Sequence, residues 1–492
     1  MHELVRASDV HAGGNRFARL LDELGVPARG SVALLLPNGL DWYVANHGAT
    51  WSGRRVTSLN WHWTTDDSAY VVADAEADVL VAHARFADAA AAAAPHVEPE
   101  RRFVVGGSLD GFRSLHDALA GHDPAPYEHP LAGSTMNYTS GTTGRPKGVF
   151  RQPAEGAPPP PRVAASGAQM LTMLAGAEPA TRPHLVAGPL YHSAPSAYST
   201  GALLLGADLV VMERFDAEEL LALVEQHKVG SIFCVPTHFV RLLKLPDAVR
   251  RRYDTSSLAL VVHGAAPVSP EVKQQMIDWW GPVLYEFYGG TEGGGTYVTS
   301  TDWLERPGTV GRPRPGVEVE VLDDDGGPVA PGEIGQVWFR EGGRQFEYKG
   351  DPAKTDAAFR DDWFSLGDLG HLDADGYLYL ADRRADVIVS GGVNIYPVQI
   401  EDALVAHPDV LDACVVGVPD DEWGEAVHAL VQPADGATID VDDLLAWTRA
   451  SLAGYQVPRS AEVVPELPRS AAGKIQRRVV RDRFWQGRSR RI

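Results

Sequence analysis

Short apolar runs that end in turn residues recur along the chain, and segments with helical spacing separate them. The runs cover residues 31–39, 77–84, 102–107, 184–192, 207–212, 230–236 and 258–267. We expect helices over 215–229 and 269–281. The first opens at Asp216 with acids in its first turn, and the second has Ser269 as N-cap and Pro270 at its first helical position. Strands that are apolar throughout and alternate with helices predict parallel sheets covered on both faces, which is an α/β fold.

The pattern changes after about residue 309, where valine alternates with polar residues around Asp-Gly and Pro-Gly turns. This alternation predicts an antiparallel or barrel-like region. A final α/β unit is expected from about residue 385, with helices over 398–410 and 441–452 and a strand over 411–420. A length of 492 residues suits about three compact units. We expect them at 1–308, 309–384 and 385–492.

Charge and composition exclude several classes of protein. The chain has 44 Lys plus Arg against 65 Asp plus Glu, a formal net charge of −21. Without a basic patch to offset this charge, we expect no binding to nucleic acid or anionic lipid. The two cysteines, Cys234 and Cys414, are too few for a disulfide framework or a cysteine-based zinc site. The N-terminus has no apolar core of signal-peptide type, and no apolar run reaches about 18 residues. We therefore expect a cytoplasmic protein without an integral membrane segment.

The segment YTSGTTGRPKG at residues 138–148 has the composition of a phosphate-binding loop. Its glycines allow backbone amides to approach an anion, its hydroxyl side chains add donors, and its lysine adds a positive charge. It lacks the Gly-Lys-Ser/Thr ending of the Walker form. We expect it to bind a polyphosphate through Thr139, Ser140, Gly141, Thr142, Thr143, Gly144 and Lys147.

Further motifs follow the phosphate loop: LYHSAP (190–195), VHGAAP (262–267), YEFYGGTEGG (285–294), SLGDLG (365–370), DRRADVIVSGGVNIYPVQIE (382–401) and LPRSAAGKIQRR (467–478). With these motifs in this order, essentially the whole chain resembles the adenylate-forming superfamily of acyl-CoA synthetases, aryl-CoA ligases, luciferases and peptide-synthetase adenylation domains. The resemblance implies a large N-terminal domain of two parallel doubly wound sheets plus a small β-barrel. It also implies a small mobile α+β C-terminal domain.

The resemblance assigns the nucleotide site. It implies that Tyr288 packs on adenine, that Thr291 contacts the α-phosphate, and that Glu292 helps to hold Mg²⁺. Further contacts with adenine are implied for Glu286, near the adenine amine, and for Gly264, Ala265 and Ala266, which are too small to block a planar base. Gly289 and Gly290 are implied to contact ATP through flexible backbone. Asp368 and Arg383 are implied to contact the ribose.

The C-terminal motifs carry the remaining implied roles. In the family, the lysine matched by Lys474 bridges the attacking carboxylate and the α-phosphate, where a positioned ammonium stabilises developing charge. The backbone at Ser390, Gly391 and Gly392 is expected to approach the pantetheine arm of CoA. Ala385 stands at the hinge position where many relatives have Lys or Asp.

The resemblance also implies an acyl pocket. Its expected residues are Tyr191, His192, His238, Gly290 and Gly293. His192 is expected between the substrate carboxylate and the phosphate, which makes it a catalytic candidate with Lys474, Thr291 and Glu292.

These assignments predict a two-step reaction with Mg²⁺ as cofactor and ATP and CoA as co-substrates. A carboxylic acid would be activated to an acyl-adenylate with release of pyrophosphate, and CoA would then take the acyl group. The alternatives are transfer to a carrier protein or an amine, activation of nitrite by an ATP-dependent diazotase, and a noncatalytic nucleotide-binding homologue. The last is disfavoured because Lys147, Thr291, Glu292, Asp368, Arg383 and Lys474 are intact. A homodimer is left open.

Overall fold

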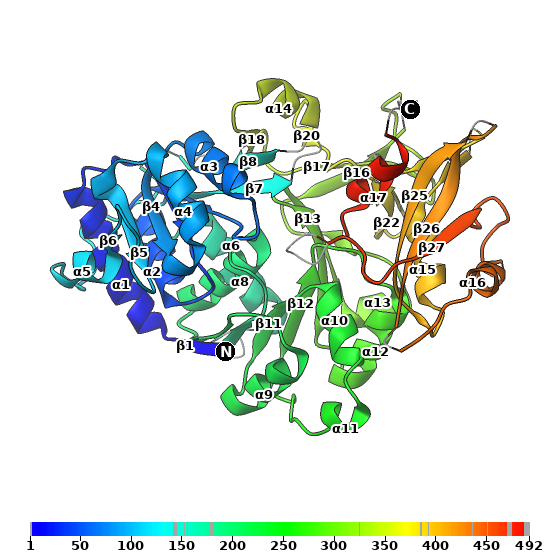
Figure 1. Cartoon of the computed structure of the whole chain (residues 1–492), viewed down its shortest axis with the longest axis horizontal. Coiled ribbons are helices and arrows are strands. Elements are labelled where there is room, and N and C mark those ends of the chain that lie inside the picture. The colour runs from blue at the N-terminus through cyan, green and yellow to red at the C-terminus, as the bar shows by residue number, and fades with distance from the viewer. Residues whose placement is uncertain are drawn as a thin grey trace.

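Four β-sheets form the framework of the chain (Figure 1). The computed structural model describes residues 2–486 except for 141–144, 152, 155, 177–180, 324, 384–385, 392, 421, 435, 450 and 470–474, and it describes only the backbone of Thr139, Ser140 and Arg383. Figure 1 shows the first sheet on one side of the molecule, the last sheet on the opposite side and the second sheet between them.

The first sheet contains eight strands within the described residues, in the order β18-β8-β7-β3-β2-β4-β5-β6. Their bounds are β2 (Ser31–Leu35), β3 (Arg55–Ser58), β4 (Ala77–His83), β5 (Arg102–Val105), β6 (Arg113–Ser114), β7 (Ser134–Ser140), β8 (Pro146–Phe150) and β18 (Glu347–Tyr348). The strands from β7 to β6 pair in parallel, and three of them, β2, β4 and β5, lie in apolar runs that predict parallel strands. β8 and β18 add an antiparallel edge.

The second sheet also contains eight strands in the described part of the chain, in the order β1-β10-β9-β11-β12-β13-β14-β15. Their bounds are β1 (His2–Val5), β9 (His184–Val186), β10 (Leu209–Met212), β11 (Ser231–Cys234), β12 (Leu260–Gly264), β13 (Leu284–Gly290), β14 (Gly293–Thr299) and β15 (Arg312–Pro313). The five strands from β10 to β13 are parallel, whereas β1, β14 and β15 pair antiparallel.

Helices cover both faces of these two sheets. Between the sheets, one shared core contains residues of α1 (Ala7–Glu23), α2 (Leu40–Trp51), α5 (Leu115–Ala120), α6 (Arg162–Ala175) and α8 (Ser193–Leu204). The outer face of the first sheet packs on α3 (Thr65–Asp74) and α4 (Ala87–Ala93). The outer face of the second packs on α9 (Ala217–His227), α10 (Pro236–Leu243), α12 (Pro270–Trp280) and α13 (Ser300–Glu305), and the short α11 (Asp247–Arg250) lies beside α9. The expected doubly wound α/β architecture is confirmed.

The predicted starts of two helices, α9 and α12, are also confirmed. Asp216 accepts a hydrogen bond from the backbone amide of Glu219 at 2.8 Å, at the start of α9. Ser269 accepts one from the amide of Val272 at 3.3 Å, and Pro270 is the first residue of α12. Each cap satisfies an amide that the first helical turn leaves without a backbone partner.

The third sheet is antiparallel, as the valine alternation predicts. It contains β16 (Glu318–Leu322), β17 (Gly335–Arg340), β19 (Phe359–Arg360), β20 (Trp363–Phe364), β21 (Asp368–Leu372) and β22 (Leu378–Arg383). Two other strands of this region belong to the preceding sheets instead: β15 pairs with β14, and β18 pairs with β8. Helix α14 (Pro352–Ala358) follows β18. These pairings tie the region to both preceding sheets.

The C-terminal sheet is smaller. It contains β23 (Ile388–Ser390), β24 (Val393–Ile395), β25 (Val410–Asp420), β26 (Gly424–Pro433) and β27 (Ser460–Val463), with α15 (Pro397–Val405), α16 (Val441–Thr448) and α17 (Arg477–Phe484). Helices α15 and α17 both contact β25. Both helices predicted here are present but end earlier than expected, at Val405 and Thr448.

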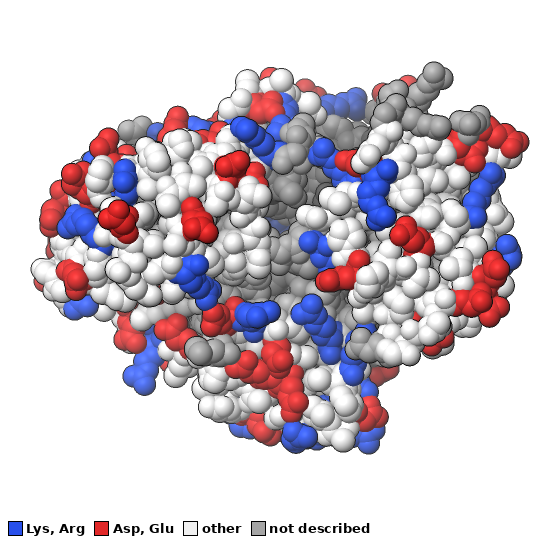
Figure 2. All heavy atoms as spheres, in the orientation of Figure 1, with Lys and Arg blue, Asp and Glu red and all other residues white. Residues whose placement is uncertain are grey.

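Every helix among the described residues is too short or too polar to cross a lipid bilayer. On the face shown in Figure 2, acidic and basic side chains are interspersed rather than gathered into one patch of a single sign.

Candidate active site

The hairpin of β13 and β14 carries the central turn of the site. Gly290 pairs with Gly293, so that Thr291 and Glu292 form the two-residue connection between the strands. Gly293, Gly294 and Gly295 all have positive φ angles, between +75° and +137°, which side-chain-bearing residues rarely adopt. The glycine run therefore fixes the backbone directly after the two predicted phosphate and magnesium residues.

Two residues with predicted nucleotide roles meet beside this turn. The hydroxyl of Tyr288 lies 2.6 Å from Oδ2 of the buried Asp368 and donates to it. Asp368 begins β21, and its backbone pairs with that of Arg383 in β22. The structure thus brings together the predicted adenine and ribose residues.

The phosphate-loop motif spans the β7–β8 hairpin. Thr139 pairs with Lys147 and Ser140 with Pro146, while Gly141, Thr142, Thr143 and Gly144 lie outside the described residues. The ammonium of Lys147 lies 2.7 Å from Oδ2 of Asp351, the N-cap of α14. Its hydrogen bond with Lys147 holds the pKa of Asp351 below its ordinary value.

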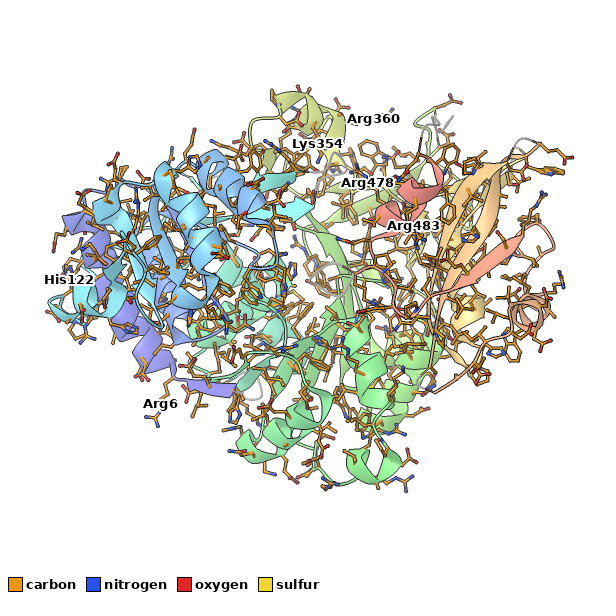
Figure 3. The ribbon with its side chains drawn as sticks, viewed as in Figure 1. Arg6, His122, Lys354, Arg360, Arg478 and Arg483 are labelled. Carbon is orange, nitrogen blue, oxygen red and sulfur yellow. The ribbon has the colours of Figure 1, made fainter. Side chains whose placement is uncertain are left out.

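A second set of contacts reaches the turn from the same region. Tyr348 on β18 donates from its hydroxyl to Oε1 of Glu292 at 2.9 Å. The ammonium of Lys354 lies 3.9 Å from the centre of the Tyr348 ring, and burial together with the charge of Lys147 lowers its pKa. Lys354, labelled in Figure 3, belongs to α14, which lies above β18 and β20 in the view of Figure 1. Two lysines thus lie close to the phosphate-loop strand and to Glu292.

Sequence reasoning missed Asp351, Tyr348 and Lys354. They lie about 200 residues after the phosphate loop, in a segment with no recognisable motif. The pairing of β18 with β8 brings them to the site, and the sequence carries no local signal for that pairing.

The predicted adenine slot lies at the end of β12. A Cβ on Gly264 would lie 2.3 Å from the backbone oxygen of Phe287, so the strands approach closely only because this residue is glycine. Ala265 has a φ of +69°, which turns the chain sharply toward Ala266.

Glu286 occupies a different environment from the other nucleotide candidates. Its carboxylate is buried and lies 2.6 Å from the ammonium of Lys273, which is fully buried on α12. Burial raises the pKa of Glu286 and lowers that of Lys273, and each opposes the other's shift by its charge. The predicted role of Glu286 at adenine stays a prediction, and its observed partner is Lys273.

A cavity of about 780 Å³ lies beside the turn. Residues from α2, α6, α8, β7, β8 and β14 line it, and the predicted site residues Gly290, Thr291 and Gly293 are among them. Its volume falls within the range of small-molecule sites.

The three aromatic acyl-pocket candidates are not among the described residues that line this cavity. Tyr191 and His192 stand just before α8 with ring centroids 4.5 Å apart. His238 stacks on Phe215 at 4.0 Å, and burial together with Arg241 lowers its pKa to about 3. His238 is therefore a neutral, packed imidazole, and the acyl role of all three remains a prediction.

The C-terminal candidates are described only in part. Gly391 follows Ser390 at the end of β23 with a φ of +58°, and a Cβ on it would lie 2.5 Å from Cε3 of Trp423. Gly392, Ala385 and Lys474 lie outside the described residues.

Helix α17 starts three residues after Lys474, and its first residue, Arg477, is held by three carboxylates. Its Nη1 lies 3.4 Å from Oδ1 of Asp382 and 3.2 Å from Oδ2 of Asp386, and its Nη2 lies 2.6 Å from Oε2 of Glu401. Oδ2 of Asp382 also accepts from the amide of Val398 at 3.1 Å. These contacts fasten the helix that follows Lys474 to both sides of residues 384–385.

Two protein-family profiles match the chain: AMP-binding enzyme over residues 7–344 and AMP-binding enzyme C-terminal domain over residues 399–474. The fatty acid–[acyl-carrier-protein] ligase ScoC of Streptomyces coeruleorubidus is 30% identical over 489 residues, covering 98% of this chain and 92% of its own. A feruloyl-CoA synthase of an Amycolatopsis species is 34% identical over 480 residues, covering 95% and 92%. The structure of the amide bond synthetase McbA from Marinactinospora thermotolerans superposes with a TM-score of 0.82 at 30% identity, covering 96% and 94%.

Proposed function

Because this chain belongs to the AMP-binding enzyme family of adenylate-forming ligases, we propose that it joins a carboxylic acid to CoA through an acyl-adenylate. The observation that carries the proposal is the convergence on one turn of two groups of contacts. Tyr288, which bonds to Asp368, stands just before the turn, and Tyr348, with Lys354 over its ring, reaches Glu292 within the turn.

In the first half-reaction, an oxygen of the acid's carboxylate attacks the α-phosphorus of ATP, and the bond to pyrophosphate breaks. Asp368 and Tyr288 hold the nucleoside, and Lys147 with the phosphate loop holds the departing phosphates. Thr291 and Lys474 donate to the α-phosphoryl oxygens, where charge develops. Fixed donors of this kind lower the barrier without acting as bases.

Glu292 fits a magnesium site. Mg²⁺ takes oxygen ligands and is commonly held by one or two protein carboxylates together with substrate phosphates. A single protein carboxylate leaves the remaining ligand positions of such a site to the phosphates of ATP and to water. Bound there, Mg²⁺ would offset phosphate charge, and the hydrogen bond from Tyr348 orients the Glu292 carboxylate that would hold it.

In the second half-reaction, the thiol sulfur of CoA attacks the acyl carbonyl and AMP leaves, with the thiol proton released to solvent. Activation makes this step accessible because AMP is a far better leaving group than the oxygen of a free carboxylate. The backbone at Ser390 and Gly391 would border the pantetheine arm.

Two other acceptors are supported by the relatives, because one is named for a carrier protein and another for amide bond synthesis. A carrier protein would present the same kind of thiol on a phosphopantetheine arm, whereas an amine would attack the same carbonyl through nitrogen. Both alternatives keep the first half-reaction and change only the second.

The test is pyrophosphate release with Mg·ATP over a panel of carboxylic acids, each with and without CoA. We expect a CoA thioester and loss of release by about 100- to 1,000-fold in Lys474→Ala. Lys228→Ala, an exposed lysine paired with Asp254, is the control. Synthetic acyl-adenylate should still yield thioester with Lys474→Ala. Pyrophosphate release that does not depend on CoA would indicate an amine or a carrier protein as the acceptor. The absence of pyrophosphate release with every acid would reject the proposal.

A further inference from the structure

The charged residues that line the cavity are mostly cationic. Among the lining residues that the structure describes, leaving histidines aside, these are Arg151, Arg162, Arg314, Arg344 and the single acid Glu347. Arg344 is paired with Asp356, at 2.7 Å between Nη1 and Oδ1. The other three arginines, Arg151, Arg162 and Arg314, are neighbours and are called the arginine wall below.

The arginine wall surrounds the buried carboxylate of Glu341. Arg162 lies 2.7 Å from Oε1 of Glu341, and Arg314 donates to the same oxygen. Arg151 lies 3.8 Å from Oε2. Arg151 and Arg162 also share the side-chain oxygen of Gln345, at 3.0 and 2.5 Å. The wall is therefore a built, interlocked group rather than three separate surface charges.

The wall carries more positive charge than Glu341 balances, because three guanidinium groups face one carboxylate. Burial, with Arg162 and Arg314, lowers the pKa of Arg151 to about 10, although Glu341 and Glu292 act in the opposite direction. Burial by itself would raise the pKa of Glu341, yet the arginines hold it below its ordinary value. Under the proposed function, the carboxylate of Glu292 binds Mg²⁺, so its negative charge does not balance the arginines. A half-buried cationic surplus favours a bound anion.

The wall adjoins the central turn of the site. Arg151 donates to the backbone oxygen of Glu292, and Nε of Arg314 donates to that of Gly294 at 3.2 Å. A Cβ on Gly293 would lie 1.9 Å from Nη2 of Arg151, so glycine is needed there for the guanidinium to approach. An anion on the wall would thus share the cavity with the group that is activated at Thr291.

We propose that the arginine wall binds a second anionic group of the substrate, so that the preferred acids are dicarboxylates. This inference rests on the proposed function and names its substrate class. One carboxylate of the diacid would meet ATP at Thr291, and the other would accept from the wall. Arginine suits this role because its planar fork of donors matches a carboxylate in bidentate geometry. The phosphates of ATP are the other source of anionic oxygen in this cavity, and the experiment separates the two.

The experiment measures kcat/KM for pyrophosphate release by the full chain with matched acids: pentanoate and glutarate, octanoate and suberate, benzoate and isophthalate. We expect at least one diacid to exceed its monoacid by about tenfold or more, the effect of one charge-assisted hydrogen bond. In Arg162→Gln this ratio should fall toward one, and Arg162→Lys should keep part of it. Arg162 is half exposed, so its loss is the least disruptive to folding. The matched control is Arg340→Gln, an exposed arginine paired with Glu318 away from the cavity.

Equal kcat/KM for monoacids and diacids in the native chain would overturn the proposal. So would a rise in KM for ATP in Arg162→Gln that is the same with every acid, which would assign the wall to the ATP phosphates. Calorimetric titration of suberate and octanoate in the presence of AMP needs no turnover. If suberate binds more tightly than octanoate and Arg162→Gln abolishes this difference, the arginine wall binds the second carboxylate even if no acid is activated. Equal affinities for suberate and octanoate would reject the proposal.

Discussion

Tyr288 and Asp368, 80 positions apart in the sequence, are joined by a 2.6 Å hydrogen bond from the phenolic hydroxyl to the carboxylate. Tyr288 pairs with Thr296 near the end of the β13–β14 hairpin and Asp368 begins β21, so this bond connects the second sheet to the third. The carboxylate is oriented before any nucleotide arrives. A group oriented in advance loses less conformational freedom on binding.

Tyr288→Phe tests this orientation. The ring remains for adenine, but Asp368 loses a donor that is worth about 1.5–3 kcal/mol to a charged acceptor. We expect KM for ATP to rise by roughly tenfold, with kcat changed much less, in steady-state pyrophosphate release. A fall in kcat at unchanged KM would contradict this assignment and indicate a role in the chemical step.

Breaking the buried ion pair of Lys273 and Glu286 should lower the free energy of unfolding. Lys273→Met leaves Glu286 buried without its 2.6 Å partner and should cost about 3–5 kcal/mol of unfolding free energy. The double variant Lys273→Met with Glu286→Leu should recover most of this loss, because no charge then remains unpaired. Urea unfolding midpoints measure both. If the double variant loses as much unfolding free energy as the two single variants together, the two side chains are not coupled.

Gly391→Ala should separate the two half-reactions. The positive φ disfavours a side chain and the Trp423 ring stands 2.5 Å from the position of a Cβ, so either this ring or the backbone beside the predicted pantetheine path must shift. We expect CoA-dependent thioester formation to slow by roughly tenfold or more, with pyrophosphate exchange retained. Adding Trp423→Ala removes the clash but not the unfavourable φ, so rescue should be partial. Equal loss of both half-reactions would count against a CoA path here.

Asp402 on α15 should make stability depend on pH. Burial, with the nearby carboxylates of Glu401 and Glu271, raises its pKa from 3.8 to about 7. Between these values the folded chain keeps a proton that the unfolded chain has lost, so stability falls as pH rises and levels off above about 7.

Asp402→Asn mimics the protonated form and should therefore raise the melting temperature increasingly from pH 5 to pH 8, by about 2 °C or more at the upper end. Thermal scans with the exposed Asp110→Asn as control measure this difference. A stabilisation that does not change with pH would show that the carboxyl proton is not the cause.

The sequence predicted those parts of the molecule that depend on neighbours in the chain. Apolar runs gave the parallel strands, and the N-caps Asp216 and Ser269 mark where helices begin. Residues that act through distant partners were not predictable. Lys273 lies in EVKQQMIDWW, where a lysine normally faces solvent, and the packing of α12 on β13 brings its ammonium to Glu286. The arginine wall was likewise unpredictable, because its three arginines meet at Glu341, which lies 190 positions after Arg151 in the sequence.

Arg477 bears on how the last part of the chain could move. Suppose that this part turns about residues 384–385 between the half-reactions. Arg477 then leaves Asp382 behind but takes Asp386 and Glu401 with it, because both lie on its own side of that point. The guanidinium therefore never becomes a stranded charge, whereas the buried Asp382 gives up its contacts with both Arg477 and the amide of Val398. A nucleotide or acyl group that binds one of the two arrangements more tightly than the other would shift the balance between them.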